Sequence, residues 1–101
     1  MARLTYSARA LADLVRLTDF LLEADASAAA TTIDLIEEAI GLLRRHRLIG
    51  RPAEHDLREL VISRGRTGYI ALYSYEEPED VASILAIRHQ SEAGYQLDDD
   101  S

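Results

Sequence analysis

Three apolar stretches in the second half of the chain constrain the fold more than any other feature of the sequence. They cover residues 57–63, 69–75 and 81–87, and each is rich in β-branched and aromatic side chains, which favour β-strands. Short segments with turn-forming residues, 64–68 and 76–80, separate the three stretches. A parallel crossover needs about a dozen residues or more, so these connections predict an antiparallel meander.

The first half of the chain predicts one short strand and two helices. Arg3–Tyr6 alternates apolar and polar residues and is expected to be an edge strand that joins the later sheet. Ser7 suits the N-cap of a first helix over about residues 8–24, and a second helical pattern runs over about residues 28–47. Asp25 opens the short break between them, which predicts an antiparallel helical hairpin.

The helical spacing also predicts which side chains are buried. In the first helix the expected apolar stripe contains Leu11, Leu14, Val15, Thr18, Leu21 and Leu22. The polar residues expected to stay hydrated are Arg9, Asp13, Arg16 and Glu23. In the second helix the expected buried stripe contains Ala29, Ile33, Ile36, Ile40 and Leu43, with Leu42 beside it.

The predicted order of elements is therefore β-α-α-β-β-β, an α+β domain in which a strand and a helical hairpin precede a twisted antiparallel sheet. The chain of 101 residues suffices for one domain, expected over residues 1–97, and the acidic residues 98–101 are expected to be a disordered tail. The centres of the last two predicted strands are apolar on both faces. A partner peptide would be a natural cover for the second face.

Composition excludes several kinds of site. The chain has no cysteine, hence no disulfide, thiolate metal site or cysteine nucleophile. His46 and His55 have no third ligand at a suitable spacing, and the acidic residues 76–80 are interpreted as a solvated turn, so neither a metal nor another cofactor is expected. No apolar run reaches about 18 residues and the N-terminus does not resemble a signal peptide, which favours a cytoplasmic protein without membrane contact.

Charge is distributed unevenly along the chain. The net charge of −7 comes from residues 76–101, whereas residues 44–66 contain seven Arg against three acidic residues. All basic residues are Arg, which pairs well with carboxylates and phosphates. A nucleic-acid-binding domain would be basic as a whole, so direct sequence-specific DNA binding is not expected.

Several short motifs in the predicted sheet resemble a known family. They are Arg58-Glu59-Leu60, Gly68-Tyr69, Leu72-Tyr73 and, most specifically, the closing run from Arg88 to Tyr95, RHQSEAGY. Together they resemble the RelE/ParE superfamily, the toxins of type II toxin–antitoxin modules. The resemblance implies the fold predicted above and neutralisation by a cognate antitoxin. The closing run looks more like the ParE side, the plasmid stabilisation proteins, whose better-studied members inhibit growth by binding and poisoning DNA gyrase.

The resemblance also leaves a ribonuclease open, because RelE-like members cut messenger RNA inside the ribosome without a metal. In such an enzyme Arg would stabilise the charged phosphorane while His protonates the leaving oxygen. The candidate catalytic residues are Arg58, Arg64, Arg88, His89 and Tyr95. However, Ile70 stands where those enzymes place an Arg, which argues against catalysis. In the structural alternative, Arg88 pairs with a carboxylate at the sheet edge and Tyr95 packs the C-terminal turn.

A second set of candidate residues is expected to bind an antitoxin or a target. These candidates are Arg44, Arg45, Arg47, Arg51, Arg58, Arg64, Arg66, Tyr73 and Arg88. The alternative interpretation is that these Arg side chains are solvated helix-end and turn charges. For Tyr73 the alternatives are base stacking and packing within the sheet. A family member that has lost toxicity and survives as a binding module is a further possibility.

Overall fold

The computed structural model describes residues 1–64 and 67–92. The elements, in chain order, are β1 (Arg3–Tyr6), α1 (Ala8–Ala24), α2 (Ala26–Gly41), the 3₁₀ turn η1 (Leu42–Arg44), β2 (Arg51–Pro52), the 3₁₀ turn η2 (Glu54–Asp56), β3 (Arg58–Arg64), β4 (Thr67–Glu76) and β5 (Val81–His89). In this part of the chain, no helix is long and apolar enough to cross a membrane. The predicted tail, residues 98–101, lies outside the described residues.

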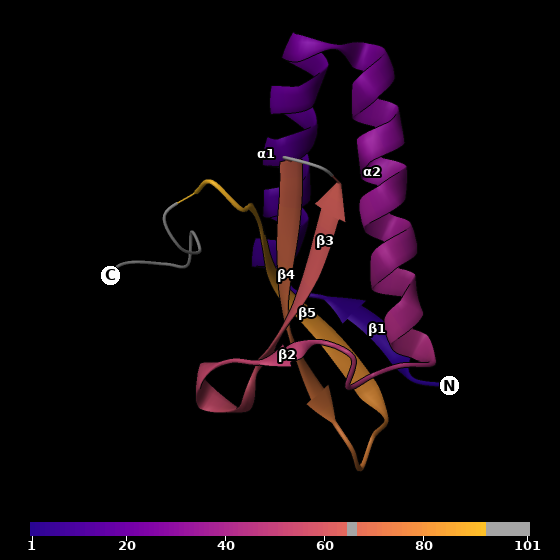
Figure 1. Cartoon of the computed structure of the whole chain (residues 1–101). Coiled ribbons are helices and arrows are strands. Elements are labelled where there is room, and N and C mark those ends of the chain that lie inside the picture. Colours follow the sequence, from indigo (N-terminus) through magenta and orange to yellow (C-terminus); the bar gives the residue numbers. More distant parts are fainter. Residues whose placement is uncertain (65–66, 93–101) are drawn as a thin grey trace.

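The strands form one sheet in the order β1-β5-β4-β3-β2, with the antiparallel helices α1 and α2 side by side (Figure 1). The meander β3–β4–β5 confirms the predicted α+β fold. β1 is indeed an edge strand and runs parallel to β5, from the pair Arg3 and Val81 to the pair Tyr6 and Ile84. The sequence analysis missed β2, because two residues that include a proline give no strand pattern.

Both helices begin at side-chain caps, Ser7 as expected for α1 and Asp25 for α2, which begins two residues before the predicted residue 28. The Ser7 Oγ accepts a hydrogen bond from the Ala10 N–H at 3.0 Å, and an oxygen of Asp25 accepts one from the Ser27 N–H at 2.9 Å. The predicted end of the second helix at residue 47 is wrong. α2 ends at Gly41, and η1 follows as a single tighter turn.

The core lies between the sheet and the inner face of the hairpin. The largest fully buried side chains are Tyr73, Ile36, Ile40, Leu43, Ile84 and Ile87. The predicted stripe of α2 is therefore confirmed at its centre, although Leu42 is half-exposed.

The predicted stripe of α1 is wrong in part. Leu11, Val15 and Leu22 are at least half-exposed, whereas Ala10, Leu17 and the expected surface residue Asp13 are buried. The apolar pattern could not reveal this orientation, because α1 packs against a strand edge that requires a polar partner as well as apolar contacts.

A β-bulge in β5 explains why this strand is apolar on both of its sequence parities. Leu72 pairs with Ala86 while its neighbour Tyr73 pairs with Ile84, so Leu85 is an extra residue. The bulge reverses the alternation along β5, and Ile84 and Ile87 both point toward the helices. The alternation of side chains along β5 is therefore interrupted at Leu85.

Candidate functional site

The C-terminal half of β5 has no strand beside it on the β1 side. There, side chains of α1 and its N-cap bind the backbone groups of β5. β1 pairs with β5 only as far as Tyr6 and Ile84. The Ser7 hydroxyl donates a hydrogen bond to the Leu85 carbonyl at 3.0 Å, and the Ile87 N–H donates one to Asp13 Oδ2 at 2.8 Å. This edge is therefore satisfied internally rather than available for strand addition.

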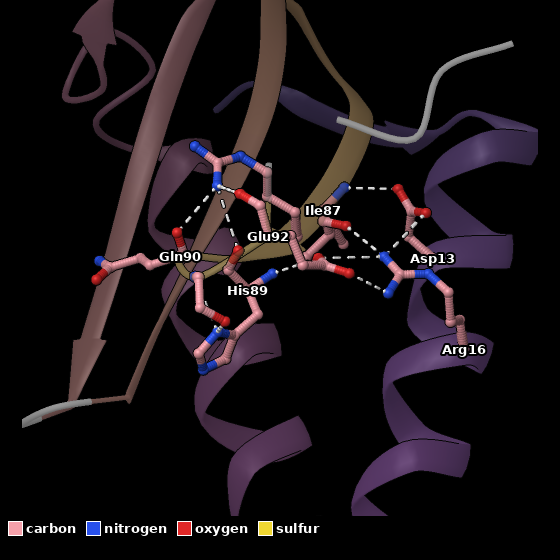
Figure 2. Close-up of polar contacts among 8 residues, drawn as sticks. Asp13, Arg16, Ile87, His89, Gln90 and Glu92 are labelled. Carbon is pink, nitrogen blue, oxygen red and sulfur yellow. Dashed lines mark hydrogen bonds and ion pairs between the residues drawn. The ribbon is translucent and has the colours of Figure 1, made fainter. Parts of the chain in front are cut away.

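Arg16 connects α1 to the turn that follows β5 (Figure 2). Its Nη1 lies 2.6 Å from Glu92 Oε2, and its Nη2 lies 3.5 Å from both Asp13 Oδ1 and the Ile87 carbonyl oxygen. Glu92 Oε1 also accepts a hydrogen bond from the His89 N–H at 2.8 Å. The guanidinium thus lies between two carboxylates, which offsets the cost of burying the Asp13 charge.

A pocket of about 380 Å³ lies beside this network, between α1 and the ends of β4 and β5. Its lining residues are Arg16, Leu17, Phe20, Tyr69, His89, Ser91 and Glu92. The Tyr69 and His89 rings meet edge to face, with their centroids 5.1 Å apart. Burial, and to a lesser extent the charge of Glu92, raises the pKa of Tyr69, so this phenol is a neutral hydrogen-bonding group at physiological pH.

The neighbours of His89 fix its tautomer. The Ser91 backbone N–H donates to His89 Nδ1 at 3.0 Å, so Nδ1 is an acceptor and the proton of the neutral ring lies on Nε2. The Ser91 Oγ lies 2.7 Å from the same nitrogen. In this arrangement the imidazole can donate one hydrogen bond through Nε2.

Arg88 lies on the opposite face of the sheet from His89. In the register of β4 and β5, Arg88 pairs with Ile70 and His89 with Tyr69. Arg88 Nη1 donates to the carbonyls of His89, Gln90 and Glu92 at 3.2, 3.3 and 3.0 Å (Figure 2). Its guanidinium therefore caps the turn after β5 through backbone oxygens. The expected pairing with a carboxylate at the sheet edge stays a prediction.

Arg58 also binds backbone oxygens. Its Nη1 donates to the Gly50 carbonyl at 2.7 Å and to the Leu48 carbonyl at 3.2 Å. Arg58 pairs with Tyr73 and His89 with Tyr69, so the two residues are four positions apart along β4, about 13 Å at the rise of a strand. The described catalytic candidates are thus not brought together. The Arg64 side chain and all of Tyr95 lie outside the described part of the chain.

The predicted Arg-rich segment divides into two groups. Arg51 pairs with Glu59 through Nε and Oε1 at 3.0 Å. Arg44, Arg45 and Arg47 are exposed together at the end of α2. Arg66 lies outside the described residues.

Tyr73 anchors the loop that follows α2 instead of facing a partner. Its side chain is fully buried, its hydroxyl donates to the Arg47 carbonyl at 2.9 Å, and it accepts from the Gly50 N–H at 2.9 Å. Burial raises its pKa, opposed by the Gly50 hydrogen bond and the Arg58 charge. A Cβ on Gly50 would lie 2.6 Å from Tyr73 Cε1, so only glycine fits there.

A second apolar surface lies on the outside of the hairpin. Leu11, Val15 and Leu22 recur at helical spacing along α1 and are exposed, and we call them the α1 stripe. A groove of about 320 Å³ adjoins it, lined by Leu14, Val15, Thr18, Asp19, Ile33 and Glu37. The sequence pattern had predicted that Leu11, Val15 and Leu22 would be buried in the core.

Comparison with known proteins places this chain in a family. The family model described as "ParE toxin of type II toxin-antitoxin system, parDE" matches residues 4–94. This chain is therefore a toxin of a type II toxin–antitoxin system. Within that class, the chain belongs to the ParE toxin family.

One curated protein is similar to this chain in sequence, and one solved structure is similar in fold. Toxin RelE3 of Caulobacter vibrioides is 38% identical over 84 residues, which cover 83% of this chain and 89% of that protein. A chain from the chromosomal ParDE system of P. aeruginosa is similar in fold, with a TM-score of 0.74 at 24% identity over 86% of this chain and 94% of that chain.

Proposed function

We propose that this toxin inhibits growth by binding DNA gyrase and that it does not cleave RNA. The observation that supports binding over catalysis is the use of Arg58 and Arg88. Each guanidinium donates to backbone carbonyls, and Arg88 lies on the opposite face of the sheet from His89. A ribonuclease would need a cation and a proton donor converging on one phosphate.

The proposed partner in the cell is a cognate antitoxin whose C-terminal segment folds on the toxin. The α1 stripe and the groove beside it offer an apolar surface suited to an amphipathic helix. The pocket near Phe20 and Tyr69 would accept an apolar side chain from the same segment.

One observation keeps the RNase in view as an alternative. His89 and Arg16 line the same pocket, where an imidazole Nε2–H and a guanidinium could both approach a phosphate. Arg16, however, is already engaged by Glu92 at 2.6 Å, and an incoming phosphate would have to compete with that carboxylate.

Two parallel assays test the proposal. Purified toxin is added to a gyrase supercoiling and cleavage reaction and to a translating ribosome extract with labelled messenger RNA. Cleaved or unsupercoiled DNA with intact RNA is expected. Cleaved RNA that is lost with His89→Ala, but retained with the exposed control His55→Ala, would establish the ribonuclease instead.

The antitoxin surface is tested separately by binding. Val15→Asp introduces a charge into the α1 stripe, whereas Val61→Asp makes the same change at an exposed position on β3. We expect the first variant to bind antitoxin at least about tenfold more weakly and the second to bind like the wild type. Equal affinities for all three proteins would remove the α1 stripe from the antitoxin interface.

A further inference from the structure

The end of α2 and the loop after it display an unusual combination of exposed side chains. Within residues 42–49 the exposed aliphatic and basic residues, which we call the 42–49 patch, are Leu42, Arg44, Arg45, Arg47, Leu48 and Ile49. Leu48 and Ile49 are 53% and 54% exposed. A shallow depression of about 390 Å³ follows the loop between Arg45 and Ile49. Aliphatic side chains next to Arg are typical of protein interfaces, in which Arg is enriched.

The backbone beneath these side chains is held in place from inside the molecule. The carbonyls of Arg47, Leu48 and Gly50 accept hydrogen bonds from Tyr73 or Arg58 at distances of 2.7–3.2 Å. The Ile49 N–H donates to the His46 carbonyl at 3.0 Å. A core tyrosine and an arginine are thus used to fix a loop that presents apolar side chains to water. A loop ordered in advance loses less entropy on binding, which is the advantage of a docking surface formed before its partner arrives.

The charges of the patch indicate the chemistry of the partner. Within residues 1–64 and 67–92, the structure has no ion pair from Arg44, Arg45 or Arg47. The Arg47 guanidinium instead lies over the Tyr75 ring, 5.2 Å from its centroid. In a chain with a net charge of −7, this is a local basic surface that complements carboxylates. The exposed aliphatic side chains favour a protein over a nucleic acid, because phosphate backbones offer them no apolar contact.

The patch lies away from the helix turn where the α1 stripe ends. It follows the C-terminus of α2, whereas the α1–α2 turn lies at the other end of this helix (Figure 1). α2 has 16 residues, so the two ends are about 24 Å apart. A ligand that covers Leu22 and the tip of the hairpin therefore need not cover Leu48.

We propose that the 42–49 patch is the surface by which the toxin docks on its protein target, and that it binds a segment in which carboxylates flank aliphatic side chains. The inference rests on the proposed function in one respect, the assignment of a protein target to this toxin. Leu48 and Ile49 supply the apolar contact, and the neighbouring Arg side chains pair with the carboxylates. The antitoxin occupies the α1 stripe instead, so the two partners use different residues of the toxin.

The test compares target binding and antitoxin binding in the same variants. Leu48→Asp removes an apolar contact, Arg45→Glu reverses a charge, and Val61→Asp is the matched control on β3. The affinity of each toxin for purified gyrase and for the antitoxin is measured, together with growth inhibition on expression and thermal stability. We expect both patch variants to bind gyrase at least about tenfold more weakly, with an antitoxin affinity within about twofold of that of the wild type. The control Val61→Asp should bind gyrase and inhibit growth like the wild type.

Three outcomes would overturn the proposal. The first is unchanged gyrase binding and unchanged growth inhibition in both patch variants. The second is an equal loss of antitoxin affinity, which would make the patch part of the antitoxin interface. The third is tight binding of a DNA or RNA oligonucleotide that Arg45→Glu abolishes and Leu48→Asp does not, which would assign the patch to a nucleic acid.

Failure of the proposed target is distinguishable from failure of this inference. If wild-type toxin does not bind gyrase but arrests growth, the gyrase assignment is wrong. If Leu48→Asp then fails to arrest growth while it still binds antitoxin, the patch remains the docking surface for another target. A normal melting temperature excludes misfolding as the cause.

Discussion

Replacement of Asp13 tests whether α1 is held to the sheet by polar contacts. Asp13 is only 2% exposed, accepts the Ile87 N–H at 2.8 Å, and lies 3.5 Å from the guanidinium of Arg16. In Asp13→Ala the Ile87 N–H is left without its acceptor next to the core. Arg16 keeps its contact with Glu92 at 2.6 Å, so its own charge stays paired.

The magnitude follows from these contacts. A hydrogen bond to a charged group contributes about 1.5–3 kcal/mol, and removal of one partner leaves a buried donor unsatisfied. We therefore expect Asp13→Ala to lower the free energy of unfolding by about 3 kcal/mol, or the melting temperature by about 15 °C for a domain of this size. Asp13→Asn retains an acceptor oxygen and should cost about 1 kcal/mol.

Urea denaturation and amide exchange provide the measurement. The matched control is Asp19→Ala, an exposed carboxylate on the same helix, which should change stability by less than about 0.5 kcal/mol. Hydrogen exchange at the Ile87 amide should accelerate in Asp13→Ala beyond the change in global stability. Equal destabilisation by the Asp13 and Asp19 variants, with Ile87 still protected, would refute the reasoning.

Three further predictions concern the loop, the core and alkaline pH. Gly50→Ala should cost about 1–3 kcal/mol because its Cβ would lie 2.6 Å from Tyr73, whereas Gly41→Ala, with no atom within 4 Å, should stabilise by up to about 1 kcal/mol, both measured by thermal melting. Leu17→Ala should cost about 2–4 kcal/mol in urea denaturation and Val15→Ala less than about 0.5, and similar values would contradict the observed orientation of α1. Because the pKa of Tyr73 is raised in the folded state, the folded protein retains a proton that the unfolded chain loses near pH 10, so stability should fall as pH rises above about 10. Tyr73→Phe should be less stable at pH 8 but should lose less stability between pH 9 and 11.

The order of the elements could be predicted because it depends on local signals. Strand propensity, turn residues and short connections were sufficient for the meander, and the cap Ser7 was sufficient for the start of α1. α2 begins two residues before the predicted residue 28. The exact end of α2 was not predictable, since a 3₁₀ turn and a helix share the same local pattern. The bulge at Leu85 was also hidden, because a sequence carries no mark of an unpaired residue.

The candidate sites were predictable as residue types but not as arrangements. The exposed Arg residues at the end of α2 were identified by their clustering. The contacts of Arg58 and Arg88 with backbone carbonyls could not be foreseen, because backbone acceptors do not vary with residue type. Tyr73 was a surface candidate in sequence, yet it is buried beneath the loop that it anchors.

The sequence by itself determined the class of fold, the order of the helical hairpin and the meander, and the family to which the toxin belongs, because all three depend on the order of residues along the chain. The tertiary structure alone decided which face of α1 is buried. An apolar stripe can pack on a core or on a partner. The edge of β5 beyond β1, where the Ile87 N–H needs an acceptor, selects the face that carries Asp13. The same choice leaves the α1 stripe exposed.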